Sequence, residues 1–460
     1  EGALSSAFIP IYAQVLNEEG KEAAERLANV VASLLVTALG IFLFLIHWLI
    51  RSVIVFVPLP AKVLLALKLL LILFPYIFFL ALVSIFIGVL QCHKKFFIPA
   101  ITPLVLNLLW IGTVLIFCTR YGSTPEEKIT ILAWGVLGAG AVQLLVNYAS
   151  LLLLGFRPRF RLDLRHPRLL KMINLMIPAA VGFSITQINI FVDLSLAMFL
   201  GDGANSALWY GNRLMQFPLG VFGIAMGTAL LPTISHQVAR RDMDELRSTL
   251  SFSVRSVFLV VIPASIGLIV LREPIIRLLF ERGEFDAAAT SRTALTLLCY
   301  CFGLFAYAGI KLIVSAFYSL QDTKTPVKIG ALCMTLNIVC NLIFMQFLRE
   351  AGLALATAVS SSVNFILLIL FLRNKIGGFE EGRIMLAFIR VTVVSILMGI
   401  GVYYFYAWFQ PALFERTALN LMLRVFSTIT CGALLYGIAG LILRVPEFSA
   451  ALQHLRTGDQ

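Results

Sequence analysis

The stretch Asn205–Gln237, NSALWYGNRLMQFPLGVFGIAMGTALLPTISHQ, decides the fold that we predict for this chain. It is long and apolar enough to cross a bilayer, yet it carries Arg213 within the apolar run. An arginine at membrane depth costs roughly 2.5–3.5 kcal/mol on the insertion scale, so it should face a partner or water rather than lipid. The stretch is therefore typical of a membrane helix that lines a polar cavity.

The same stretch contains residues that bend helices. Pro218 and Pro232 each remove a backbone hydrogen bond, and Gly220 and Gly223 carry no side chain to hold a neighbouring helix away. We therefore interpret the segment as a bent helix with a conformational hinge at these four residues.

The start of the chain echoes this stretch. ALSSAFIP at 3–10 aligns with AMGTALLP at 225–232, and a second echo aligns residues 90–107 with residues 320–337. Two echoes at nearly equal spacing predict two similar halves, which is how many transporters enclose a site.

Composition places the whole chain in a membrane. It has 460 residues, of which 60% are hydrophobic and 13% charged, and its mean hydropathy is +0.94. Runs of ~20 apolar residues predict about thirteen crossings. The formal net charge is +12, but the basic residues fall mainly in short connections. That distribution indicates membrane topology and not nucleic-acid binding, and it predicts that the basic connections are cytoplasmic.

The most basic connection, RPRFRLDLRHPRLLK at 157–171, divides the chain. The predicted domains are an incomplete N-terminal lobe (1–156), a basic cytoplasmic linker (157–171), a C-terminal lobe (172–376), and two additional transmembrane helices with a cytoplasmic tail (377–460). No GK[ST] loop, HExxH motif or CxxC pair occurs, so we predict no catalytic residue and no enzyme.

Several motifs resemble the MurJ (MviN) family of lipid II flippases in the MOP transporter superfamily. They are GALSSAFIP (2–10), FPYI (74–77), IPAITPLVLN (98–107), NRLMQFPLGVFGIAMGTALLPTIS (212–235) and FYSLQDTKTPVKI (317–329). The resemblance implies an all-α polytopic fold of two lobes, six plus six helices, around a cationic cavity. It also implies two extra C-terminal helices, and that the family's first helix and a half is absent from this chain.

The resemblance also assigns substrate-binding residues. Arg213 matches an important cavity arginine, and Glu1 resembles the acidic residue of an EGA motif. Gln216 stands where many relatives have glutamate, three residues after the arginine. For Arg213 the alternative is a structural ion pair.

Some members of the family hold a sodium ion, and the matching positions here are Asp193, Asn337, Asn341, Thr357 and the Leu353 carbonyl. The two asparagines are one helical turn apart, as are Leu353 and Thr357, and hard cations prefer oxygen ligands. The alternative is a buried, protonated and hydrogen-bonded aspartate at position 193.

We therefore expect a multi-pass flippase of the bacterial inner membrane that acts as a monomer among membrane lipids. It would move lipid II, the undecaprenyl-diphosphate-linked peptidoglycan precursor, to the outer leaflet by alternating access. Its energy would come from an ion gradient or the membrane potential, with no cofactor other than a coupling sodium ion. The alternatives are a flippase for another lipid-linked oligosaccharide, a multidrug antiporter of the same superfamily, a membrane enzyme acting on polyprenyl phosphates, and a structural protein of cell-wall assembly.

Overall fold

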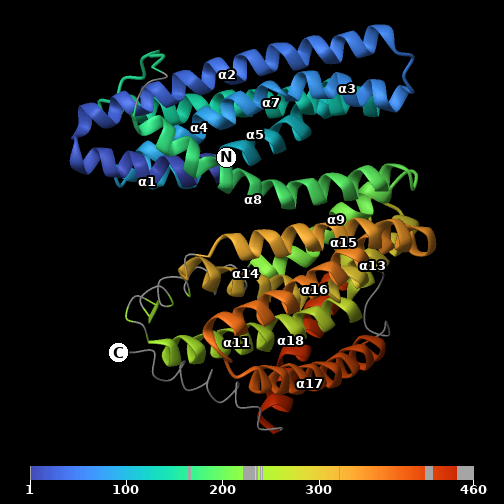
Figure 1. The fold of residues 1–460 in the computed structure, drawn as a ribbon. Coiled ribbons are helices and arrows are strands. Elements are labelled where there is room, and N and C mark those ends of the chain that lie inside the picture. Colours follow the sequence, from blue (N-terminus) through green and yellow to red (C-terminus); the bar gives the residue numbers. More distant parts are fainter. Residues whose placement is uncertain are drawn as a thin grey trace. The chain divides into compact units, whose positions relative to one another are not determined.

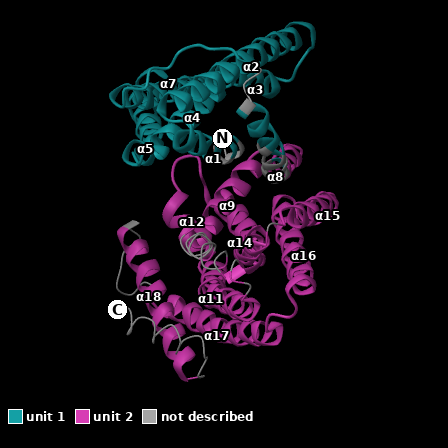
Figure 2. Ribbon diagram, turned by 60° about the vertical axis from the view of Figure 1, so that its left-hand side comes forward, with its two compact units in different colours: residues 1–184 teal, residues 185–460 magenta. Residues whose placement is uncertain are grey.

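The structure, a computed structural model, describes residues 2–163, 167–220, 242–320, 322–409 and 418–442, with isolated positions between 230 and 240. Within those residues the chain is helical and contains no strand, so the all-α prediction is confirmed. Two compact units divide the chain, residues 1–184 and residues 185–460 (Figure 2).

Unit 1 consists of long helices joined by short turns (Figure 1). They are α1 (Gly2–Glu18), α2 (Lys21–Phe56), α3 (Ala61–Leu73), α4 (Pro75–Cys92), α5 (Phe97–Gly112), the π-helix η1 (Thr113–Cys118), α6 (Thr119–Tyr121), α7 (Pro125–Leu153) and the first part of α8 (Pro167–Met198). The core of the unit lies where α1, α2 and α4 meet, around the buried side chains of Phe8, Tyr12, Leu27 and Ile85.

The predicted linker packs on unit 1. The backbone N–H of Arg159 donates to Asn29 Oδ1 at 2.9 Å, and that of Arg161 donates to Ser33 Oγ at 2.7 Å. Both acceptors lie on one face of α2, because they are one helical turn apart. The first residues of the linker are therefore held in place by side chains of α2.

Unit 2 contains the remaining helices. They are the end of α8, α9 (Ala204–Pro218), α11 (Met243–Val270), α12 (Arg272–Phe280), α13 (Ala287–Cys301), α14 (Leu304–Ser319), α15 (Lys324–Leu348), α16 (Glu350–Ile376), α17 (Glu381–Trp408) and α18 (Ala418–Ile442). Helix α17 packs on α11 and α18 packs on α17, so the two helices predicted to follow the second lobe lie against unit 2.

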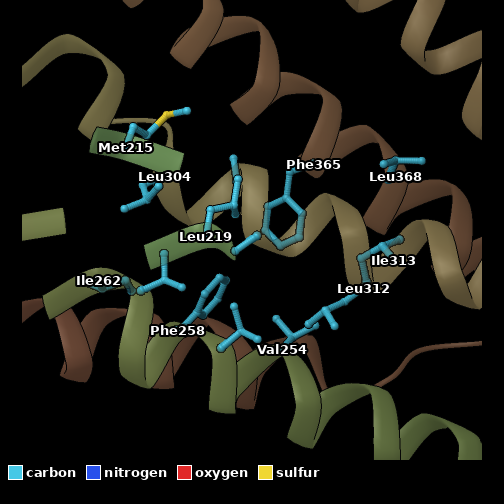
Figure 3. Close-up of a cluster of buried hydrophobic side chains, with 14 of the residues drawn as sticks. Met215, Leu219, Val254, Phe258, Ile262, Leu304, Leu312, Ile313, Phe365 and Leu368 are labelled. Atoms are coloured by element: carbon cyan, nitrogen blue, oxygen red, sulfur yellow. The ribbon is translucent and has the colours of Figure 1, made fainter. Parts of the chain in front are cut away.

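The core of unit 2 is aromatic and aliphatic. Figure 3 shows Met215 and Leu219, from the end of α9, on the same cluster as Phe258 of α11 and Phe365 of α16. The rings of Phe258 and Phe365 have centroids 6.1 Å apart at 76°, an edge-on arrangement that aromatic pairs favour.

The described helices account for most of the roughly thirteen crossings that the sequence predicts. Nine helices of the described residues are long and apolar enough to span a bilayer, and α13 with α14, bent by 44°, makes a tenth. Of the other predicted crossings, the opening one is α1, of 17 residues. The crossing predicted for the stretch 205–237 begins with α9 and runs into residues outside the described ranges, and α8 contains the shorter apolar helix Gln187–Met198.

A polar clamp joins the start of α15 to the end of α16. Asp322 accepts hydrogen bonds from the backbone N–H of Thr325 at 3.0 Å and from its hydroxyl at 2.8 Å, and it pairs with Lys375 Nζ at 2.7 Å. The Lys375 ammonium, with the Thr325 bonds, holds the pKa of the Asp322 carboxyl well below its usual range.

Helices α15 and α16 meet so closely that one position admits no side chain. A Cβ at Gly352 would lie 2.3 Å from the carbonyl oxygen of Phe344, whereas a Cβ at Gly330, on α15, would meet nothing within 4 Å. Backbone atoms cannot give way as a side-chain tip can, so Gly352 sets the approach of the two helices.

We therefore predict that Gly352→Ala destabilises the protein by about 1–3 kcal/mol, the usual cost of overpacking. Gly330→Ala makes the same chemical change in open space, and should leave stability unchanged or raise it by up to about 1 kcal/mol. Thermal unfolding of the two purified variants measures the difference. Equal melting temperatures would contradict the packing of α15 on α16.

Candidate functional site

Helix α9, which begins the stretch that decides the fold, has two unlike faces. Ala207, Leu208, Gly211 and Met215 are buried against unit 2, with the spacing of one helical face. The opposite face carries Arg213 among exposed residues. The apolar periodicity of α9 thus directs the arginine away from the core of its own unit.

Arg213 makes no ion pair with any residue in the described part of the chain. Its guanidinium lies over the ring of Trp209, with Cζ 5.6 Å from the ring centroid, which is within the range of a cation–π interaction. The ring orients the cation and leaves its fork of N–H donors available to an anion.

Of the other predicted substrate-binding and hinge residues, the structure describes Gln216, Pro218 and Gly220. Gln216 lies on the same exposed face and donates through Nε2 to Asn212 Oδ1 at 2.5 Å. Glu1 lies outside the described residues, as do Gly223 and Pro232. Of the predicted hinge, Pro218 is the last residue of α9 and Gly220 is exposed, so the α-helix ends where the proline occurs.

A second site lies where α8, α15 and α16 meet, and it brings together all five residues predicted to hold a cation. Asn341 Nδ2 donates to Asp193 Oδ1 at 2.6 Å, and Thr357 Oγ1 donates to Asp193 Oδ2 at 3.3 Å. Asn341 Nδ2 also donates to Asn337 Oδ1 at 2.9 Å, and Thr357 Oγ1 lies 3.0 Å from the Leu353 carbonyl. The Asn341–Asn337 and Thr357–Leu353 bonds each lie within one helix, and the Asp193 carboxylate links these two helices to α8.

The chemistry of this network fits a hard monovalent cation. Five oxygen-bearing groups converge, and one of them is a carboxylate. Asn341 is fully buried and its Oδ1 has no hydrogen-bond partner among the described residues. Burial of an acceptor without a hydrogen-bond donor costs its free energy of hydration, and coordination of a cation would offset that cost.

The structure adds one residue that was not predicted. Ser360, buried on α16, accepts a hydrogen bond from Asn337 Nδ2 at 3.3 Å and donates to the Thr357 carbonyl at 3.1 Å. It lies three residues after Thr357 and so on the same helix face. That spacing could have identified Ser360, but serine is common in membrane helices and gives a weak signal.

Several known proteins that are similar in sequence to this chain belong to one family. The family model described as "Lipid II flippase MurJ" matches residues 1–423. A probable lipid II flippase MurJ of Vibrio cholerae serotype O1 is 36% identical over 386 residues, which cover 80% of this chain and 72% of the relative. The lipid II flippase MurJ of Burkholderia cenocepacia is 32% identical over 386 residues, covering 82% and 74%.

Solved structures show the same likeness. The structure described as "Lipid II flippase MurJ, inward closed conformation" superposes with a TM-score of 0.78 at 26% identity, covering 96% of this chain and 88% of that one. An inward-facing multidrug resistance MATE family transporter of the MOP superfamily superposes with a TM-score of 0.68 at 17% identity, covering 83% and 87%, and shows the fold alone. The family model, the relatives and the fold agree, and the chain belongs to the family of the lipid II flippase MurJ.

Proposed function

We propose that this chain is a lipid II flippase, a multi-pass protein of the bacterial inner membrane that moves the precursor from the cytoplasmic to the outer leaflet. The observation that carries the proposal is Arg213, an arginine on the exposed face of α9, which begins a crossing predicted from sequence, in a chain of this family. An intramembrane charge without an acidic partner is costly, and a transported anion would offset that cost.

The physical task explains why a cation is needed. The head of lipid II carries a diphosphate and polar sugars, which cannot enter hydrocarbon without partners. The polyprenyl tail is apolar and can stay in lipid throughout. A guanidinium binds phosphate oxygens through two parallel N–H donors, so Arg213 would hold the diphosphate while the rest of the head crosses.

Alternating access requires that the helix bearing the cation change shape. Helix α9 ends at Pro218, and Gly220 follows with open space around its α-carbon. Just after Pro218 the backbone changes from α-helical to π-helical hydrogen bonding, at Leu219 and Gly220, and such a change is a point at which a helix can bend. We propose that the hinge comprises Pro218, Gly220, Gly223 and Pro232, on the C-terminal side of Arg213.

Energy coupling would use the Asp193 network. A sodium ion would be held by Asp193, Asn337, Asn341, Thr357 and the Leu353 carbonyl, and it would supply a fixed positive charge between α8, α15 and α16. Ion binding would then favour one arrangement of these helices over another, which is the requirement for a coupled transporter.

The rival functions fit the site less well. A multidrug antiporter for cations needs an acidic cavity, and Arg213 has the opposite charge. An enzyme acting on polyprenyl phosphates needs a catalytic cluster, and among the described residues no group of three or more His, Cys, Asp or Glu side chains could hold a metal ion. A flippase for another lipid-linked oligosaccharide uses the same physics and differs only in the head that it accepts. We propose a transporter without enzymatic activity that acts as a monomer.

Depletion of the protein from cells tests transport directly. Lipid II accessible to an external probe should fall severalfold while the inner pool rises, because the precursor is still made but no longer crosses. The two pools are measured by external labelling and extraction. Unchanged exposure would exclude a lipid II flippase, and a deficit in a different lipid-linked sugar would identify the rival substrate.

Arg213→Ala should abolish complementation of the depleted strain without lowering membrane abundance, because the diphosphate loses its charge-assisted bonds. Arg213→Lys should retain part of the activity, since it keeps the charge and loses the planar fork. Arg277→Ala, at an exposed arginine of α12 outside the site, is the matched control and should grow normally. Full growth of Arg213→Ala would remove the residue from the mechanism.

Sodium should stabilise the purified protein against heat, by about 1.4 kcal/mol at ten times the dissociation constant. Asp193→Ala and Thr357→Val should lose this stabilisation, whereas Asp244→Ala, at an exposed carboxylate on α11, should keep it. Potassium at equal ionic strength controls for screening. A sodium-dependent shift of the same size in the wild type and Asp193→Ala would reject the site.

A further inference from the structure

Unit 2 contains a cavity of about 480 Å³ that the proposed transport function does not use. It lies at the ends of α9, α12 and α13. One wall is aromatic, with the ring centroid of Tyr210 4.6 Å from that of Phe280 and 5.3 Å from that of Phe285. The remainder of the lining is small or polar.

The cavity is on the side of the membrane that the sequence predicts to be outside. The basic connections of unit 2 adjoin the start of α11 at Met243 and the end of α16 at Ile376. The cavity instead adjoins the start of α13, and its Arg292 pairs with Glu350 at the start of α16. A ligand would therefore reach it from the outer surface.

The polar lining favours an anion. The lining holds two arginines, Arg282 and Arg292, and one acidic residue, Glu284, while Glu350 pairs with Arg292 from outside the lining. Helix α9 begins at the cavity with Gly203 as N-cap and no side-chain capping bond. The N–H groups of an uncapped first turn add positive potential and donors at this position.

The Arg292 guanidinium is held by two hydrogen bonds, and one of its nitrogens has no hydrogen-bond partner among the described residues. Its Nε donates to Glu350 Oε1 at 2.5 Å and its Nη1 donates to the Asp202 carbonyl at 2.8 Å. A Cβ at residue 203 would lie 3.0 Å from Nη1, so glycine gives the guanidinium room. The third nitrogen, Nη2, is buried and has no hydrogen-bond partner in the part of the chain that the structure describes. The protein thus orients this cation with donor capacity left over.

Thr293 independently indicates a ligand. Its side chain is 1% exposed, it lines the cavity, and its hydroxyl has no partner among the described residues. A threonine in a helix usually donates to the carbonyl four residues earlier, as Thr296 does to Arg292 at 2.9 Å. A buried hydroxyl without a partner is unfavourable, and a bound acceptor would remove that cost.

We propose that this cavity binds a phosphate group from the outer side of the membrane. Arg282 and Arg292 would supply the charged donors, Ser206 and Thr293 the hydroxyl donors, and the first turn of α9 the backbone donors. Phosphate has enough acceptor oxygens to use such a set, and guanidinium groups suit its geometry. The inference is independent of the transport activity.

Two sources could present this phosphate, an anionic phospholipid headgroup or free phosphate. Leu279 on α12 and Leu295 on α13 are exposed large apolar side chains on helices that border the cavity. Apolar side chains at a membrane boundary can contact acyl chains while a headgroup occupies the polar pocket. The experiment separates the two sources.

In one arm, the full chain in phosphatidylcholine nanodiscs is titrated with inorganic phosphate at constant ionic strength, with binding followed by calorimetry. In the other arm, native mass spectrometry counts phosphatidylglycerol retained from mixed nanodiscs. Arg282→Gln should weaken binding about tenfold and Thr293→Val about fivefold, whereas Glu284→Gln should strengthen it about threefold, because it removes a repelling charge.

The matched controls are Arg277→Gln on α12 and Thr296→Val on α13, which make the same changes outside the lining and should bind as the wild type does. Unchanged melting temperatures of Arg282→Gln and Thr293→Val show that the cavity persists. Binding in either arm with this order of variants supports the proposal, and the arm identifies the source. Absence of binding in both arms, or equal losses in variants and controls, would overturn it.

Discussion

Polar groups inside hydrocarbon must find partners within the protein, and this constraint shapes both sites of the chain. Water is absent at membrane depth, so an unmatched donor or acceptor keeps its full desolvation cost. At Asp193 the cost is met by amides and hydroxyls of α15 and α16, which bind the carboxylate and one another. At Arg213 the described residues supply an aromatic ring and no carboxylate.

The two charged residues differ in their surroundings: Asp193 is hydrogen-bonded to neighbouring helices, whereas Arg213 is exposed. Asn337 and Asn341 of the Asp193 network are buried, whereas Asp193 and Thr357 are half-buried, an arrangement that would suit an ion that binds and is released while its ligands stay in place. Arg213 lies on the other side of α9, reachable by a large ligand. On the proposed function, the same helix packing would give one site for a small cation at Asp193 and one open position for a bulky anion at Arg213.

Much of this could be predicted from sequence because it is local. The all-helical fold follows from long apolar runs. The Asp193 set is implied by the resemblance to the family, and the one-turn spacing of its pairs on α15 and α16 supports it. The end of α9 at Pro218 follows from the chemistry of proline. The pairing of Arg292 with Glu350 could not be predicted in this way, because the partners are 58 residues apart and meet only once α13 packs on α16. The unpartnered hydroxyl of Thr293 is equally invisible in sequence, since nothing but packing distinguishes it from Thr296.

The attachment of residues 159 and 161 to α2 has a mechanical consequence. Because its backbone is hydrogen-bonded to α2 at both residues, this short segment moves together with α2 and not independently of it. The basic side chains of Arg159 and Arg161 therefore start from fixed points on α2, so the field that they produce has a defined origin. Residues 159–161 therefore do not act as a flexible tether.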